Sequence, residues 1–196
     1  MTMRAKIMKR GFDIIASALG LLLLWPVILV SWLIARKDTG ASGFFLQQRV
    51  GRHGRLFWVV KLRTMRPVAG TSITTSNDAR ITKWGARFRR LKIDELPQLW
   101  NVLKGEMSFV GPRPDVPGYL DKLLPEHRAL LELRPGITGP ATLKYRNEEE
   151  ILAAQPDPER YNDEVIWPDK VRINLEYLEG WSMGKDIGYI LKTVRG

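Results

Sequence analysis

The chain contains one long apolar stretch, residues 14–35, which reads IIASALGLLLLWPVILVSWLIA and includes no charged residue over 22 positions. A straight helix of that length is about 33 Å long, enough to cross a hydrocarbon core of about 30 Å. The residues that follow, Arg36-Lys37-Asp38, lack the small-residue cleavage site of a signal peptide. We therefore expect residues 1–38 to form a membrane anchor.

Basic residues flank this anchor on both sides. Residues 1–37 hold six Lys or Arg and one acidic residue. Because basic residues favour the cytoplasmic side, both ends are predicted to lie there. Pro26 stands near the middle, where a proline kinks or reverses a helix. The pattern favours a re-entrant helix, broken at Pro26, that dips into one leaflet; a kinked helix that spans the membrane is the alternative.

The rest of the chain, residues 39–196, is predicted to be one cytoplasmic domain. The whole sequence has 196 residues, 31 Lys+Arg against 21 Asp+Glu, two His and no Cys. These counts exclude a disulfide framework, a thiolate zinc site and a cysteine nucleophile, and they disfavour a histidine metal cluster. Any chemistry is expected to rest on carboxylates, and any metal is expected to be a hard ion such as Mg²⁺.

The predicted fold class is α+β and mostly helical. Residues 44–49 and 56–63 read as two strands of a hairpin, joined by a glycine-containing turn. Apolar residues at 81, 84, 88 and 91, with basic residues between them, predict an amphipathic helix, which lies on the membrane interface or packs on a core. The remaining expected elements are a polar loop over 67–79, a helix over 98–104, a turn over 134–140, a short helix over 148–154 and one or two helices over 175–195.

The most informative polar residues are Asp94 and Glu95, which precede the helix expected over 98–104. Asp94 stands where an N-cap belongs, with Pro97 in the first turn. The helix dipole would keep Asp94 ionised as a nucleophile, and the same helix end attracts phosphate. Glu95 could move protons or hold a metal. Capping alone would also explain Asp94.

Three cations are candidates for binding an anion. Strand alternation places Lys61 and Arg63 on one face of the second strand. Arg113 lies between Pro112 and Pro114, which stiffen the backbone, and a guanidinium held in this way suits bidentate recognition of phosphate. A solvated strand end and an unused surface arginine are the alternatives.

Several strings, in this order and at this spacing, resemble the bacterial sugar transferase family, the monotopic phosphoglycosyl transferases. The small size is similar to the minimal PglC-type form of bacterial N-linked glycosylation. The strings are Lys61-Leu62-Arg63-Thr64-Met65, Asp94-Glu95-Leu96-Pro97-Gln98-Leu99, Asn101-Val102-Leu103-Lys104-Gly105-Glu106-Met107-Ser108, Val110-Gly111-Pro112-Arg113-Pro114 and Arg134-Pro135-Gly136-Ile137-Thr138-Gly139.

The resemblance implies a reaction and a location. It implies Mg²⁺-dependent transfer of a sugar phosphate from a UDP-sugar to polyprenyl (undecaprenyl) phosphate, with release of UMP, at the cytoplasmic face of the bacterial inner membrane. Asp94 would attack the β-phosphate and form an acyl-phosphate intermediate. Glu95 would handle protons or, with Asp94, hold the metal. The PglC-type likeness suggests UDP-N,N′-diacetylbacillosamine or a similar sugar nucleotide.

The resemblance also implies substrate contacts. Arg80 and Arg87 could face either substrate or lipid. Three departures from the family pattern are Trp25 before Pro26 in place of Ser, Pro140-Ala141-Thr142 in place of an aromatic residue and Gln, and a choice between Asp169 and Asn174 at the position of an expected acid. The candidate substrate and phosphate ligands are Lys61, Arg63, Arg113, Arg146 and Asp169.

Other classes of function compete with this reading. A basic nucleic-acid-binding protein is disfavoured, because half of the net charge of +10 lies beside the anchor and no nucleic-acid-binding signature is present. A non-catalytic, basic membrane-bound scaffold would not need Asp94 and Glu95 followed by Arg113. A glycoside hydrolase is disfavoured because its two acids flank the scissile bond and are not adjacent in sequence.

Overall fold

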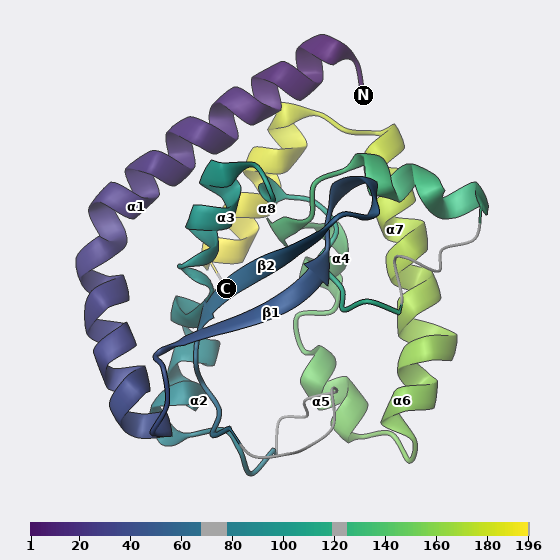
Figure 1. The fold of residues 1–196 in the computed structure, drawn as a ribbon. Helices are drawn as coiled ribbons and strands as arrows, with labels where there is room; N and C mark the ends of the chain where they lie inside the picture. Colours follow the sequence, from purple (N-terminus) through teal and green to yellow (C-terminus); the bar gives the residue numbers. More distant parts are fainter. Residues whose placement is uncertain (68–77, 119–124, 196) are drawn as a thin grey trace.

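The computed structural model describes residues 1–67, 78–118 and 125–195. Helices dominate these residues, and the strands form two small sheets (Figure 1), which confirms the mostly helical α+β prediction. The polar loop expected over 67–79 falls largely outside the described residues.

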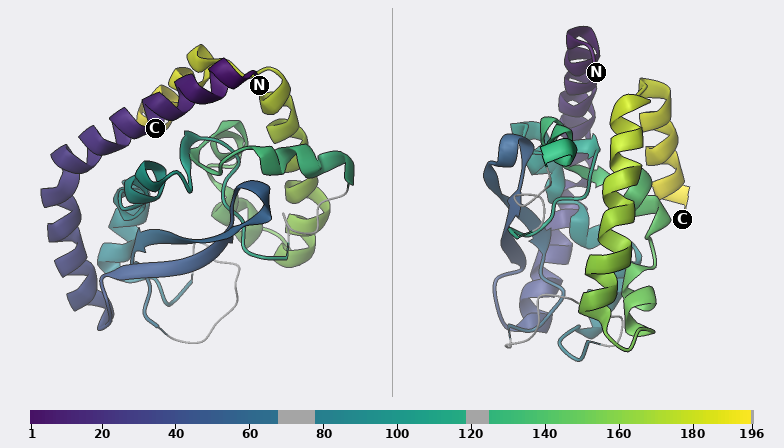
Figure 2. Two further views of the ribbon diagram at one scale, coloured as in Figure 1. Left: turned by 45° about the horizontal axis from the view of Figure 1, so that its top comes forward. Right: turned by 90° about the vertical axis from the view of Figure 1, so that its right-hand side faces the viewer.

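Helix α1, Met3–Thr39, is long and apolar enough to cross a membrane. Thr2 caps its start, and Gly40 ends it in the left-handed conformation with φ 69°. The helix continues through Pro26, so the predicted break is not confirmed. Instead, α1 bends around one side of the body (Figures 1 and 2). The re-entrant path in the membrane stays a prediction.

Only a narrow stripe of α1 faces the body. Its buried residues are small or polar, and Gly20 lies so close to Leu99 that an added Cβ would stand 3.0 Å from Leu99 Cδ1. The large apolar side chains face outward, which is the reverse of a helix that packs on a soluble core. The buried residues are Asp13, Ser17, Ser31, Ala35 and Thr39, and the most exposed apolar ones include Leu19, Leu22, Leu23, Trp25, Val30 and Leu33.

Polar contacts fix the first turns of α1 to the body. Arg10 donates from Nη1 to the carbonyl of Val102 at 2.6 Å and from Nη2 to that of Leu103 at 2.8 Å. These carbonyls belong to the last turn of α3, Gln98–Lys104, where the helix itself supplies few donors; the Val102 carbonyl also accepts from the Gly105 N–H at 3.0 Å. Asp13 accepts hydrogen bonds from Ser108 Oγ and from the Phe109 N–H, both at 3.1 Å.

A buried ion pair adds a third attachment. Lys9 Nζ lies 2.5 Å from Asp186 Oδ2, with side chains that are 12% and 2% exposed. Tyr177 Oη and Trp181 Nε1 also donate to this carboxylate, at 2.7 and 3.0 Å. Burial and the charge of Asp186 raise the pKa of Tyr177, so its hydroxyl stays a donor. The start of α1 is therefore part of the core of the protein.

Strands β1, Phe44–Val50, and β2, Leu56–Leu62, form the predicted antiparallel hairpin, with ends within one residue of the expected ones. The inner face of β2 buries Phe57 and Val59 against Val102 and Met107. Asn101 of α3 ties this sheet down, because its side chain accepts from the Val60 N–H and donates to the Trp58 carbonyl. The hairpin and α3 therefore form one connected layer.

A second sheet lies where the sequence predicts only a turn. Strand β3, Ser108–Val110, pairs in parallel with β4, Gly136–Thr138. Strand β4 lies inside the segment 134–140 that is expected to be a turn. The pairing depends on glycine, because a Cβ on Gly136 would lie 2.2 Å from the Gly111 nitrogen, and one on Gly139 would lie 2.4 Å from the Gly111 carbonyl oxygen. The short sheet therefore joins the segments around residues 108–114 and 134–139, which are far apart in sequence.

The other helices complete the body. Helix α2 buries Gly85 and Phe88, but Trp84 and Leu91 of the predicted apolar stripe are 40% and 62% exposed, so packing of this stripe on the core is confirmed only in part. The closing segment predicted over 175–195 is the end of one helix and the whole of a second. The bounds are α2 Lys83–Arg90, α4 Pro140–Lys144, α5 Glu148–Ala153, α6 Pro158–Tyr161, α7 Trp167–Glu179 and α8 Met183–Arg195, with 3-10 turns at Arg52–Gly54, Ile93–Glu95 and Pro125–Glu132 and a π turn at Asn162–Ile166.

We predict that Asp186→Asn destabilises the protein by about 3 to 5 kcal/mol, because it leaves the buried Lys9 ammonium without a counter-charge. Glu164→Gln is the matched control: it breaks an exposed pair with Arg160 and should cost less than about 1 kcal/mol. Thermal unfolding of the purified full chain, followed by circular dichroism, measures both. Equal shifts in Tm would contradict a core role for the ion pair.

Candidate active site

Asp94 and Glu95 lie in the 3-10 turn Ile93–Glu95, which connects α2 to α3. Lys92 precedes them in the left-handed conformation, with φ 56°. This reversal turns the chain inward, and both acidic residues are only 8% exposed. The N-cap of α3 is Pro97, which makes no side-chain cap. The prediction that Asp94 caps this helix is therefore wrong.

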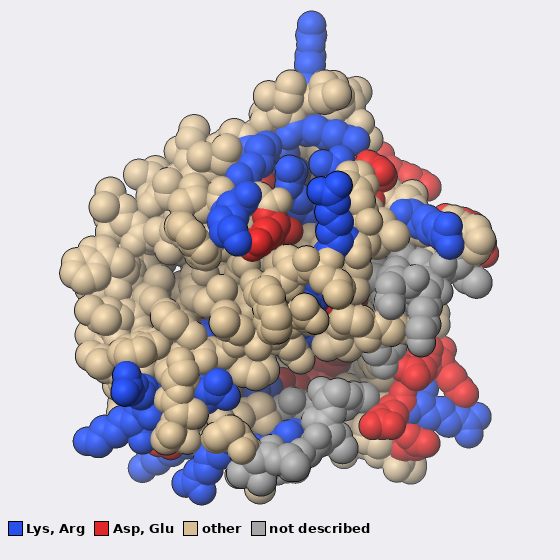
Figure 3. Space-filling view, in the orientation of Figure 1, with Lys and Arg blue, Asp and Glu red and all other residues tan. Residues whose placement is uncertain are grey.

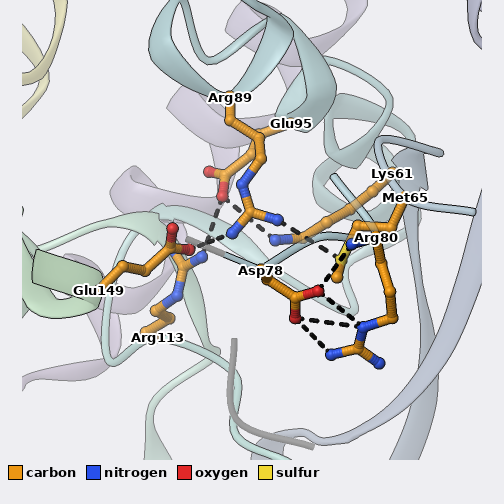
Figure 4. A network of polar contacts seen from close by, with 8 residues as sticks. All are labelled: Lys61, Met65, Asp78, Arg80, Arg89, Glu95, Arg113 and Glu149. Carbon is orange, nitrogen blue, oxygen red and sulfur yellow. Dashed lines mark hydrogen bonds and ion pairs between the residues drawn. The ribbon is translucent and has the colours of Figure 1, made fainter. Parts of the chain in front are cut away.

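Glu95 is held between two cations from different parts of the chain (Figure 4). Its Oε1 lies 3.2 Å from Lys61 Nζ and 3.0 Å from Arg113 Nη2. Burial by itself would raise the pKa of Glu95, but Lys61 and Arg113 outweigh burial and hold it well below its usual range. Glu95 in turn raises the pKa of Arg113. The cluster therefore keeps an ionised carboxylate between two cations.

Asp94 has a different environment from its neighbour. Its Oδ1 is buried and has no hydrogen-bond partner among the described residues. Burial, followed by the charge of Glu95, raises the pKa of Asp94, and Lys61, Arg89 and Lys92 offset part of this increase. The predicted stabilisation by a helix end is absent. A buried polar atom without a hydrogen-bond partner costs free energy. A ligand or an electrophile that binds Oδ1 would remove this cost.

Arg89, in the last turn of α2, adds a third cation. Its guanidinium pairs with Glu149 of α5 and lies 3.8 Å from the Met65 sulfur (Figure 4). Asp78 and Arg80 form a separate pair nearby, with Arg80 Nη2 2.5 Å from Asp78 Oδ2. Sequence reasoning missed Arg89 and Glu149, because neighbouring arginines fill α2 and Glu149 lies within a run of three glutamates.

The short parallel sheet positions Arg113. Gly111 and Pro112 follow β3 directly, and the Gly111 N–H donates to the Thr138 carbonyl of β4 at 2.9 Å. Arg49 of β1 supports the other end of the loop, because its Nη1 donates to the Pro114 carbonyl at 3.0 Å. The contact between the two glycine-containing motifs thus aims Arg113 at Glu95.

Arg49 also belongs to a charged layer behind Arg113. Burial lowers the pKa of Arg49 to about 10, and burial raises the pKa of Asp115 to about 6. Lys170 of α7, whose charge opposes the shift at Asp115, donates to both carboxylate oxygens of Glu148 at 2.7 Å. The sequence offers one signal for this layer: Arg49 is one of two charged residues in otherwise uncharged strands.

Three predicted ligands lie outside this cluster and have other partners. Arg63 donates to the carbonyls of Ser42 and Phe44 and lies over the Phe45 ring. Arg146 donates to the Lys192 carbonyl near the end of α8. Asp169 accepts from Lys144, Tyr145 and Arg172, and so joins α4 to α7. Their role in substrate binding stays a prediction.

The carboxylates fit a hard cation only in part. Among residues 1–67, 78–118 and 125–195, no group of three or more His, Asp or Glu could surround a metal. Mg²⁺, however, typically takes one or two protein carboxylates and completes its shell with water and substrate phosphates. The adjacent, buried carboxylates of Asp94 and Glu95 match that type of site and not an all-protein cage.

Comparisons with known proteins identify a family for the whole chain. A profile of the family described as "Bacterial sugar transferase" matches residues 4–196. The chain is 36% identical over 192 residues to the "Uncharacterized sugar transferase EpsL" of Bacillus subtilis, covering 96% of this chain and 86% of that protein. It is 38% identical over 197 residues to the "Undecaprenyl-phosphate glucose phosphotransferase" of Komagataeibacter xylinus, covering 95% of this chain and 35% of that protein.

A third relative has an intermediate length. The "UDP-glucose:undecaprenyl-phosphate glucose-1-phosphate transferase" of Caulobacter vibrioides is 33% identical over 193 residues, covering 95% of this chain and 68% of that protein. The chain thus spans most of some relatives and about a third of others. The match of the family profile over nearly the whole sequence, together with these relatives, shows that the chain belongs to the bacterial sugar transferase family, the phosphoglycosyl transferases.

Proposed function

We propose that this protein transfers a sugar 1-phosphate from a UDP-sugar to polyprenyl phosphate. The observation that carries the proposal is the buried, unpartnered Oδ1 of Asp94 in a cluster that also holds the three cations described above. Relatives named as transferases that use undecaprenyl phosphate support the acceptor. The reaction would be the first membrane step in assembling a glycoconjugate.

The proposed reaction has two displacements at one phosphorus atom. Asp94 Oδ1 attacks the β-phosphorus of the UDP-sugar, and the bond from that phosphorus to the bridging oxygen breaks, which releases UMP. The sugar phosphate is then held on Asp94 as an acyl phosphate. An oxygen of polyprenyl phosphate attacks the same phosphorus, the bond to Asp94 breaks, and polyprenyl diphosphate sugar leaves with the carboxylate regenerated.

The cations supply electrostatic stabilisation for both displacements. Lys61 and Arg113 now share Glu95, and a diphosphate that enters beside Glu95 would take hydrogen bonds from both. Arg89 would exchange Glu149 for a phosphate oxygen in the same way. Burial and the charge of Glu95 raise the pKa of Asp94, whereas Lys61, Arg89 and Lys92 oppose this increase, so these cations favour the ionised carboxylate that the attack requires.

We also propose that Asp94 and Glu95 hold Mg²⁺ together with the diphosphate. The ion would neutralise charge on the leaving UMP. Without the ion, the two buried carboxylates would repel the negatively charged diphosphate. Lys61, Arg89 and Arg113 remain the residues of this chain that orient the phosphate oxygens.

We further propose that residues 1–38 anchor the enzyme as a re-entrant, monotopic helix at the cytoplasmic face of the bacterial inner membrane, with residues 39–196 as the catalytic domain. Charge at both ends of the apolar stretch supports this topology. The sugar is UDP-N,N′-diacetylbacillosamine or a similar sugar nucleotide. A non-catalytic scaffold would gain nothing from a buried carboxylate cluster, which costs stability.

The decisive experiment is UMP release by the detergent-solubilised full chain with undecaprenyl phosphate, Mg²⁺ and a panel of UDP-sugars that includes diacetylbacillosamine, glucose, galactose and N-acetylgalactosamine. We expect release with one or a few sugars and none without metal. Continued release of UMP over many turnovers without polyprenyl phosphate, or transfer of the sugar without its phosphate, would refute the proposal.

We predict that Asp94→Asn lowers the rate of UMP release by about 10⁴-fold or more, because the amide cannot form the acyl phosphate. The change removes one charge without removing the side chain, so Tm should not fall. Single-turnover release of UMP measures the effect. A substantial rate in the Asp94→Asn variant would rule out Asp94 as the nucleophile.

Arg113→Lys should reduce kcat/KM by about 10²-fold, because lysine cannot make the two parallel hydrogen bonds of a guanidinium. Arg160→Lys is the matched control on α6, where the guanidinium is exposed and pairs with Glu164. Steady-state kinetics with the preferred UDP-sugar compare the two variants. Similar activities would show that Arg113 does not bind the phosphates.

A further inference from the structure

The outer face of the hairpin has an unusual composition. Strands β1 and β2 contain two charged residues, Arg49 and Lys61, and both are directed inward to the charged cluster. The opposite face exposes Leu46, Leu56 and Trp58, which are 55%, 52% and 54% exposed. In a water-soluble hairpin the apolar side chains face the core and the charged ones face solvent. Here the inner face does bury Phe57 and Val59, but both charged residues are also on that face and the outer face is apolar.

The hairpin register gathers these side chains into one surface. Trp58 is directly opposite Gln48, and the next pair on the same face is Val60 with Leu46. Gln48 is therefore a single polar side chain between apolar ones. Leu56 continues the face along β2.

Trp100 of α3 extends the same apolar surface toward α1. Its side chain is 52% exposed, and the next residue, Asn101, is hydrogen-bonded to the Trp58 carbonyl at 2.7 Å. Leu99, also on α3, packs against Gly20 of α1. The order across the surface is thus β1, β2, α3 and α1.

The space-filling view shows the extent of this surface. In Figure 3, which has the orientation of Figure 1, Lys, Arg, Asp and Glu gather along the upper edge, at the lower left and at the lower right. The area from α1 across to the hairpin is almost free of them. Contiguous exposed apolar patches of this kind mark interaction sites in proteins that are otherwise soluble.

We propose that the outer face of the hairpin, together with Trp100, inserts into the boundary between lipid headgroups and acyl chains beside α1. This inference rests on the membrane association proposed above and adds a second, non-helical contact to it. Continuity with the outward apolar surface of α1 identifies lipid as the occupant, and the scarcity of charge on the described part of this face argues against contact with bulk water. Tryptophan suits this boundary because its ring is apolar and its indole N–H is a donor.

Insertion of the outer face would also place the charged residues of the inner face close to the membrane. Lys61 extends from the opposite side of the same strand that carries Trp58. Insertion of the outer face would therefore hold Lys61 and Glu95 one strand thickness from the lipid boundary. An acceptor whose phosphate lies at that boundary could then reach the charged cluster without leaving the membrane.

Site-directed spin labelling tests the proposal, because the chain has no native cysteine. Full-length Leu46→Cys, Trp58→Cys and Trp100→Cys variants carry a nitroxide in lipid nanodiscs. Leu23→Cys, 73% exposed on α1, is the lipid control. Glu176→Cys is the water control, on α7, which lies on the opposite side of the body from the hairpin (Figure 2, right). Collision rates with oxygen and with a water-soluble nickel complex are measured at each site.

We expect oxygen collisions to exceed nickel collisions at positions 46, 58, 100 and 23, and the reverse at 176. Nickel collisions that dominate at 46, 58 and 100 while 23 stays lipid-like would overturn this inference and leave the anchor intact. Water-like behaviour at 23 as well would refute the membrane association on which it rests. Low rates with both reagents and spin–spin broadening at 46 or 58 would show that a second copy covers the face, which also overturns it.

Discussion

The structure depends on two adjacent buried carboxylates, Asp94 and Glu95, which differ in how their charge is compensated. A charge can be buried only if other groups compensate it. Glu95 receives Lys61 from the hairpin and Arg113 from the loop after β3, whereas Asp94 Oδ1 receives no hydrogen bond from the described residues. The fold therefore brings cations from distant segments to one acid and leaves an oxygen of the other without a hydrogen bond from the described residues. This division of roles is what a nucleophile beside a bound diphosphate requires.

Hydrogen bonds connect the first turns of α1 directly to the elements of the candidate active site. Arg10 binds the end of α3, whose start follows Asp94 and Glu95, and Asp13 binds the β3 segment that leads to Arg113. Both segments of the site are thus attached to the first turns of α1. The elements that carry Glu95 and Arg113 are therefore connected to each other through α1.

Local patterns in the sequence predicted part of this structure. The hairpin followed from two apolar runs with glycines between them, and residue types selected Asp94 and Glu95 as candidate catalytic acids and Lys61 and Arg113 as candidate phosphate ligands. Only the structure shows that Lys61 and Arg113 both pair with Glu95. The position of Asp94 could not be predicted, because it depends on the left-handed Lys92 that precedes the two acids. The β3 and β4 pairing joins residues far apart in sequence, and Arg63, Arg146 and Asp169 found partners that only the tertiary fold brings near.

The most direct test of the central claim is the intact mass of the protein after incubation with its UDP-sugar and Mg²⁺, without any lipid acceptor. A nucleophilic Asp94 predicts a mass increase of one sugar phosphate, located by peptide analysis at Asp94, removed by hydroxylamine and discharged by undecaprenyl phosphate. An unchanged mass during continued UMP release, or an adduct on another residue, would contradict the roles assigned to the two carboxylates.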